Sequence, residues 1–215
     1  MLESLVPMII FAWRDCIMST KVRATIEDLY TLPDKAKAEI VDGEIVLMSP
    51  TGEMPGRAGG SIYVSLRQHE GKTRGRAYPD NVGFRVNLPN RESFSPDVAW
   101  YTGPSRGMKF AEGAFVFAVE VRSEYDGPIA EQLMAAKRSD YFAAGTLVVW
   151  DVDLLGTDVI KCYDANNPDN PRIFRRGDVA DPNPPCPDGV FRLTNYSVSG
   201  SASIEDKTKS VNPSQ

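Results

Sequence analysis

The sequence has few of the side chains that build several common kinds of functional site. It contains a single histidine, His69, which excludes a metal centre made of several histidines. Its three cysteines, Cys16, Cys162 and Cys186, are widely spaced and form no CxxC pair, so the usual zinc and thiol redox motifs are absent. This cysteine usage is typical of a reducing compartment, and we expect a cytoplasmic protein.

A long apolar run and an excess of positive charge are also missing. The apolar run at residues 5–13 is too short to cross a bilayer, so we expect no membrane partner. The net charge of −5 argues against a nucleic-acid binder with a basic surface overall. It leaves room for a local basic groove, for which the candidates are Arg57, Arg67, Lys72, Arg74 and Arg76.

The chain of 215 residues, 42% hydrophobic and 25% charged, is long enough for one substantial core. We predict an N-terminal extension at residues 1–20, one folded domain at 21–198 and a disordered tail at 199–215, which is polar and lacks apolar periodicity. Two interpretations of the N-terminal segment stay open. It is either an extension upstream of a natural start at Met18, or an amphipathic helix that packs on the domain or on a partner.

The apolar patterns predict an α/β fold with a mixed sheet. Asp42-Gly43 between apolar residues indicates a hairpin within residues 39–48. Further strands are predicted at 77–88, 97–101, 114–121 and 146–152, and a Gly- and Pro-rich loop at 49–60. Because strands are followed by a helix that leads into another strand, we expect a mixed α/β sheet in a single domain.

Helices are predicted at residues 25–30, 61–70 and 129–144. In the last of these, Leu133, Ala136, Tyr141 and Ala144 are expected on the buried side. Gly145 is placed to end that helix.

Two acidic residues interrupt strand-like apolar runs. Asp97 follows Pro96 at the start of one run, and Glu120 lies near the end of another. An unpaired carboxylate is costly to bury, but two on neighbouring strands could share a divalent cation such as Mg²⁺ or Mn²⁺. Such a metal activates water and stabilises charge on a phosphate, which predicts metal-assisted hydrolysis. Alternatively, Asp97 caps a turn and Glu120 pairs with an arginine.

Two further residues are candidates for the same site. Lys137 lies on the helix after the Glu120 strand and could orient a nucleophilic water or stabilise developing negative charge. It could equally be a solvated helix lysine. Tyr141, one turn further on, is either a wall of the site or part of the core. Glu39 is a candidate third acid for the metal, although a Glu at a strand start is commonplace.

Together these residues form an ordered set of motifs. They are Glu39-Ile-Val-Asp-Gly-Glu-Ile-Val-Leu-Met-Ser-Pro, Ser95-Pro96-Asp97-Val98-Ala99, Val119-Glu120-Val121-Arg122-Ser123, and Lys137-x3-Tyr141-x3-Gly145 followed by Val148-Val149-Trp150-Asp151. Over residues 22–195 this order resembles the Uma-two family of candidate restriction endonucleases, in the PD-(D/E)XK nuclease superfamily. The resemblance implies a restriction-endonuclease-like core, a mixed sheet with flanking helices.

The resemblance also implies roles for individual residues. Asp97 matches the aspartate of the PD motif, and Glu120 matches the acid of the (D/E)XK motif. The lysine of that motif would fall at Arg122, and Lys137 resembles its migrated replacement. Glu39 matches an N-terminal acid that joins the metal site.

The function implied is hydrolysis of DNA phosphodiester bonds by a Mg²⁺-dependent endonuclease, with Mn²⁺ as a substitute metal. Symmetric cleavage of a duplex needs two sites, so we expect a homodimer. The alternative is a catalytically silent nuclease fold that serves as a binding or assembly module.

Overall fold

The computed structural model describes residues 22–33, 36–72, 74–123, 129–157, 159–182 and 191–192. The predicted N-terminal extension and C-terminal tail, with Cys16 and Cys186, lie outside the described residues. The described part has a mixed α+β fold, which confirms the predicted fold class. Within it, no helix combines the length and the apolar character needed to cross a bilayer.

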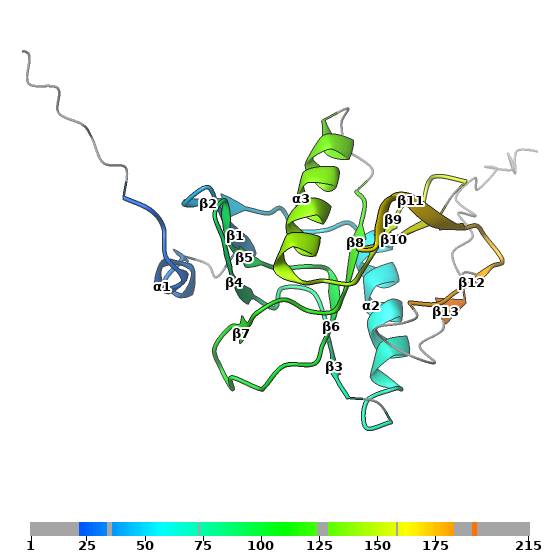
Figure 1. Cartoon of the computed structure of the whole chain (residues 1–215), viewed down its shortest axis with the longest axis horizontal. Helices are drawn as coiled ribbons and strands as arrows, with labels where there is room; N and C mark the ends of the chain where they lie inside the picture. Colours follow the sequence, from blue (N-terminus) through cyan, green and yellow to red (C-terminus); the bar gives the residue numbers. More distant parts are fainter. Residues whose placement is uncertain are drawn as a thin grey trace, which may run out of the picture.

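Two large sheets and three helices make up this part of the chain (Figure 1). The helices are α1 (Ile26–Tyr30), α2 (Glu53–Arg67) and α3 (Ala130–Ala144). One sheet has the strand order β2-β1-β5-β4-β7, another has the order β11-β10-β9-β8-β6-β3, and β12 pairs with β13. The strands are β1 (Ala38–Val41), β2 (Glu44–Leu47), β3 (Arg76–Tyr78), β4 (Phe84–Leu88), β5 (Arg91–Phe94), β6 (Val98–Tyr101), β7 (Ala111–Glu112), β8 (Phe117–Val121), β9 (Val148–Val152), β10 (Ile160–Asp164), β11 (Asn167–Phe174), β12 (Val179–Ala180) and β13 (Phe191–Arg192).

Local signals place several of these elements where the sequence predicts them. Asp42 and Gly43, with φ of 52° and 76°, form the tight turn between β1 and β2. Thr25 and Asp28 form a capping box that begins α1. Gly145 adopts φ 109° and ends α3, as expected of a glycine C-cap.

The central strands of the six-stranded sheet, β6, β8 and β9, are covered on both faces. One face packs against α2, whose Ala58, Ile62 and Leu66 contact alternate residues of β6 and β8, such as Val98 and Phe117. The residues in between point to the other face, where Ala99, Ala118 and Val149 pack with Tyr141 of α3 and with phenylalanines of the five-stranded sheet. Any side chain on this second face of β6 and β8 therefore lies under α3 and the smaller sheet.

The structure differs from the predicted architecture in three places. The strands form two large sheets rather than one, because the chain passes from β5 to β6 and so leaves one sheet for the other. The predicted strand at 77–88 is two strands, β3 and β4, which belong to different sheets. The predicted loop at 49–60 contains the first half of α2, which begins at Glu53.

The buried side of α3 was also predicted wrongly in part. Tyr141 is fully buried, but Leu133 is 65% exposed and Ala136 is exposed. The inward side of the helix instead carries Lys137, whose side chain is 16% exposed. This helix presents charged groups to the sheet because buried carboxylates lie opposite it.

Candidate active site

The fold brings Asp97 and Glu120 side by side. Strands β6 and β8 are antiparallel with Val98 opposite Val119, so one step further along the ladder Asp97 lies opposite Glu120. Residues paired in this way point to the same face of a sheet. The backbone N–H of Val121 donates to Asp97 Oδ2 over 2.8 Å, which fixes the aspartate at the end of the ladder. Both acids line one cavity of 780 Å³.

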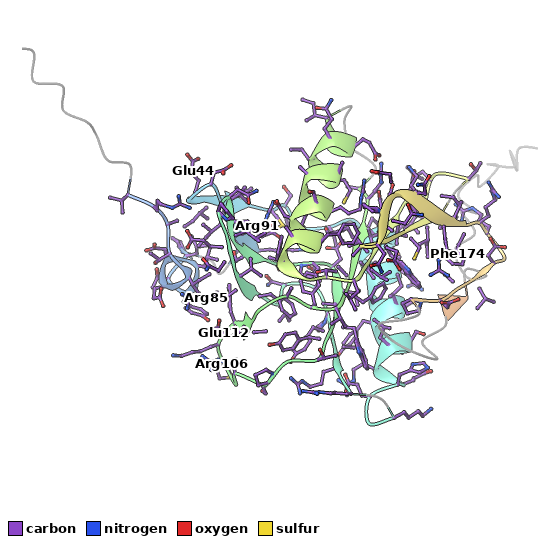
Figure 2. All side chains as sticks on the ribbon, in the orientation of Figure 1. Glu44, Arg85, Arg91, Arg106, Glu112 and Phe174 are labelled. Carbon is purple, nitrogen blue, oxygen red and sulfur yellow. The ribbon has the colours of Figure 1, made fainter. Side chains whose placement is uncertain are left out.

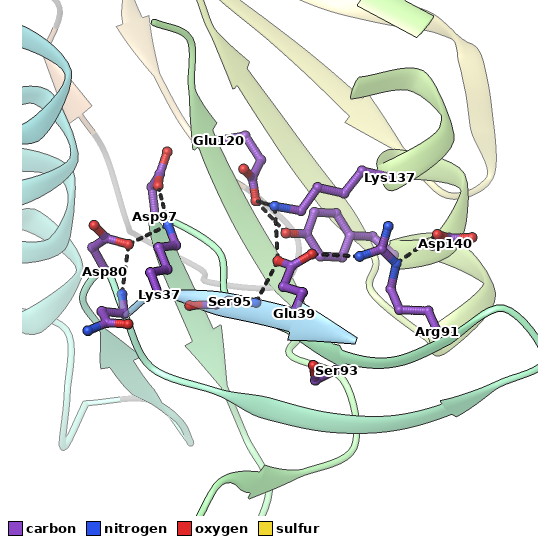
Figure 3. Close-up of polar contacts among 12 residues, drawn as sticks. Lys37, Glu39, Asp80, Arg91, Ser93, Ser95, Asp97, Glu120, Lys137 and Asp140 are labelled. Atoms are coloured by element: carbon purple, nitrogen blue, oxygen red, sulfur yellow. Dashed lines mark hydrogen bonds and ion pairs between the residues drawn. The ribbon is translucent and has the colours of Figure 1, made fainter. Parts of the chain in front are cut away.

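Lys137 reaches this face of the sheet from α3. Its ammonium lies 3.0 Å from Glu120 Oε1 and 3.2 Å from Glu39 Oε1 (Figure 3). Tyr141, four residues later on the same side of the helix, donates its hydroxyl to the same oxygen of Glu120. The pairing that the sequence left open for Glu120 is therefore with a lysine and a tyrosine, not with an arginine.

Glu39 forms one cluster with Asp97, Glu120, Lys137 and Tyr141, but protein donors already bind both of its carboxylate oxygens. The backbone N–H of Ser95 donates to Oε1 over 2.8 Å, and the Arg91 guanidinium donates to Oε2 over 2.6 Å. Arg91 also contacts Asp140 of α3 at 2.8 Å, so it joins the smaller sheet to the helix. In this arrangement Glu39 holds Lys137 and Arg91 in place.

The cluster shifts the proton affinities of its members. Burial raises the pKa of Glu120 to about 7, against the opposing effect of Lys137. Burial by itself would lower the pKa of Lys137, but Glu120 and Glu39 outweigh it and hold that pKa above its ordinary value. For Glu39, the attraction of Lys137 and Arg91 outweighs burial and lowers its pKa. In this arrangement Lys137 is protonated and donates to Glu120 and Glu39.

A second lysine, which the sequence analysis missed, lies on the Asp97 side of the cluster. Lys37 Nζ lies 2.9 Å from Asp97 Oδ1 and 2.5 Å from Asp80 Oδ1. Its spacing could have revealed it: Lys37 precedes Glu39 by two residues, and strand alternation puts residues two apart on one face. Asp80 had no comparable signal, because it lies in a turn far away in the sequence.

Arg122, which the resemblance matched to the lysine of the (D/E)XK motif, is bound by acids. Its Nε and one terminal nitrogen each lie 2.6 Å from an oxygen of Asp151, whose side chain is fully buried. The same guanidinium contacts Glu131 of α3 at 2.6 Å. This bidentate pairing raises the pKa of Arg122 above its ordinary value and keeps the side chain charged. Arg122 lines the cavity, but much of its charge is offset by these partners.

A family model described as "Putative restriction endonuclease" (Uma2) matches residues 26–194 of the chain. The chain belongs to this family. The resemblance drawn from the motifs is thereby confirmed, and membership in the Uma2 family supports a nuclease-type function. No curated protein matches the chain.

A solved structure shows the same fold. The crystal structure of a "putative nuclease belonging to DUF820" from Anabaena variabilis superposes with a TM-score of 0.56. The two proteins are 14% identical, and the match covers 74% of this chain and 88% of the other. At this identity the likeness concerns the fold alone.

Whether a divalent metal fits this Uma2-family site depends on the donor set. Among the described residues, no group of three or more His, Cys, Asp and Glu side chains is arranged to hold a metal ion. Mg²⁺ is often bound by one or two carboxylates and keeps several waters, so a pair of acids beside an open cavity is compatible with it. Asp97, 21% exposed, and Glu120 provide such a pair at the wall of the cavity.

Proposed function

We propose that the protein is a metal-dependent endonuclease that hydrolyses phosphodiester bonds in DNA. The observation that carries the proposal is the cross-strand pair of Asp97 and Glu120, which lines one cavity and has Lys137 hydrogen-bonded to Glu120. Glu120 is buried, and a charged carboxylate that is taken out of water costs free energy that an ion pair does not always repay. Family membership supports the same class of reaction.

Each residue has a distinct proposed role. Asp97 and Glu120 would hold Mg²⁺ or Mn²⁺, which when bound supplies an activated water and offsets charge on the phosphate. Lys137 keeps Glu120 oriented and contributes a fixed positive charge near the reacting groups. Glu39 holds Lys137 by its Oε1, and any role it has as a further metal ligand would run through a water.

DNA binding would depend on local positive charge. With a net charge of −5, the protein should bind DNA modestly and lose affinity as salt rises. Cutting both strands symmetrically would require two copies of the site, and we propose a homodimer on that ground.

The test is a cleavage assay on duplex, single-stranded and branched DNA with Mg²⁺, Mn²⁺ or EDTA. Wild-type protein should cleave only with metal, and Asp97→Ala and Glu120→Gln should each abolish cleavage. The matched control is Glu112→Gln. Glu112 does not line the cavity; it lies with Arg85 and Arg106 at the lower left of the view in Figure 2 and forms surface ion pairs of 3.9 and 3.6 Å. Cleavage that persists unchanged in both site variants would refute the assignment.

The second candidate is a catalytically silent module. It is favoured by the pairing of each acid with a lysine and by the lack, among the described residues, of a three-acid group suited to a metal. This reading predicts DNA binding or self-association without cleavage of any DNA form, and both properties should survive Asp97→Ala.

A further inference from the structure

Of the two lysines in the cluster, Lys37 is the one that faces the open space. Among the described residues, those that line the 780 Å³ cavity include Lys37 together with Asp97, Asp80 and Glu120, but not Lys137. The acids that hold Lys37 are 21% and 44% exposed, whereas those that hold Lys137 are 5% and 9% exposed. A substrate phosphate that enters the cavity would therefore border Lys37 rather than Lys137.

The anchoring of Lys37 suits it to hold a ligand in addition to the protein. An ammonium group has three N–H donors, and the two carboxylates on Lys37 use two of them (Figure 3). Asp80 would keep the ammonium at the cavity wall even when a metal ion draws Asp97 away from it.

We propose that Lys37 is the phosphate-binding lysine of this site, and that its ammonium, which contacts Asp97 when no metal is bound, competes with an incoming divalent cation for that carboxylate. The inference rests on the proposed nuclease function and assigns a group that contacts the DNA backbone. Lys137 then acts as a positioning residue for Glu120. When DNA binds, the third N–H of the Lys37 ammonium contacts a phosphate oxygen, and if a metal ion takes Asp97, the contact with Asp80 would keep the ammonium in place.

Two properties of Lys37→Met should change in opposite directions. DNA affinity, measured by fluorescence anisotropy on a labelled duplex in EDTA, should fall, and the slope of log K against log salt should shrink by about 1. Mn²⁺ affinity without DNA, measured by calorimetry, should rise about tenfold, because a positive charge close to the metal position has been removed. A lysine that merely supported the Asp97 carboxylate would instead give weaker metal binding when removed.

Control variants make the result specific. Lys109→Met removes a charge from an exposed loop outside the cavity and should leave both the salt slope and Mn²⁺ affinity unchanged. Lys37→Arg keeps the charge and should keep the salt slope. Lys37→Gln repeats the test with a polar side chain of similar length, and circular dichroism checks that each variant is folded.

The outcomes separate this inference from the nuclease assignment. The inference is overturned if Lys37→Met and Lys37→Gln keep the wild-type salt slope, if their Mn²⁺ affinity falls, or if the wild-type protein binds no DNA. If the wild-type protein fails to cleave DNA while the salt slope still depends on Lys37, the nuclease assignment fails and the phosphate contact stands.

Discussion

Replacing Glu120 with glutamine should change how the stability of the fold depends on pH. Glu120 is buried, with a pKa of about 7 in the fold against an ordinary value of 4.5. Since a tenfold change in proton affinity corresponds to about 1.4 kcal/mol, this difference amounts to about 3 kcal/mol. Glutamine has nearly the same shape and can still accept hydrogen bonds from Tyr141 and Lys137.

The sign follows from which state holds the proton more tightly. Below pH 4.5 Glu120 is protonated in both states and its burial carries no charge penalty. As the pH rises toward 7 the unfolded chain releases the proton first, so the wild-type fold loses stability that Glu120→Gln does not lose. The free energy of unfolding of Glu120→Gln minus that of wild type should therefore increase by about 3 kcal/mol between pH 4.5 and pH 8.

Urea denaturation followed by circular dichroism, in EDTA and at several pH values, measures this difference. Glu39→Gln provides a control of opposite sign. Because the pKa of Glu39 is lowered, its charge stabilises the fold above pH 4.5, and the cost of Glu39→Gln should disappear as the pH falls through that lowered pKa. A Glu120→Gln difference that stays constant or shrinks as the pH rises would refute the burial of an ionisable group at this position.

Three other substitutions test separate parts of the structure. Lys137→Met removes the cation between two buried carboxylates and should lower the free energy of unfolding by about 3 kcal/mol at pH 8, measured by urea denaturation, and abolish cleavage. Asp151→Asn breaks the buried bidentate pair with Arg122 and should lower the free energy of unfolding by about 3 kcal/mol. A double-mutant cycle with Arg122→Met should show that most of this loss belongs to the interaction between the two side chains. Gly145→Ala forces alanine to adopt φ 109° and should lower the free energy of unfolding by about 1 kcal/mol. Gly60→Ala, in a helix with open space around the added methyl group, should not destabilise the protein. Thermal unfolding of the two variants measures the difference.

The strands and the main pair of acids were predictable because their signals are local. Asp97 and Glu120 each stand beside an apolar run, and only the antiparallel register of β6 and β8 was needed to bring them together. The start of α2 was missed because its first turns contain Pro55 and several glycines. Proline is tolerated in the first turn, where the N–H groups lack partners within the helix. Gly59 lies against Val98 of the sheet, so a small residue there suits close packing.

The electrostatic partners could not be predicted from the sequence, because they come from distant segments. Lys37 and Asp97 are separated by 60 residues, and Arg91 and Asp140 by 49. No local pattern reports which cation will lie beside which acid once two sheets and a helix have packed together. The same is true of α3, where an expectation of apolar residues on the inner side placed Leu133 wrongly.

The charged inner side of α3 is itself an argument for a functional site. Replacing a buried ion pair by apolar residues of similar volume is often neutral or stabilising. The stability of the fold therefore does not explain why Lys137 and its two carboxylate partners occupy this buried position instead of apolar residues. A helix that needed only to cover the sheet would be expected to turn Leu133 inward and leave Lys137 in solvent. The reverse orientation, beside a cavity lined by Asp97, Glu120 and Lys37, is explained if the charges serve a ligand that enters that cavity.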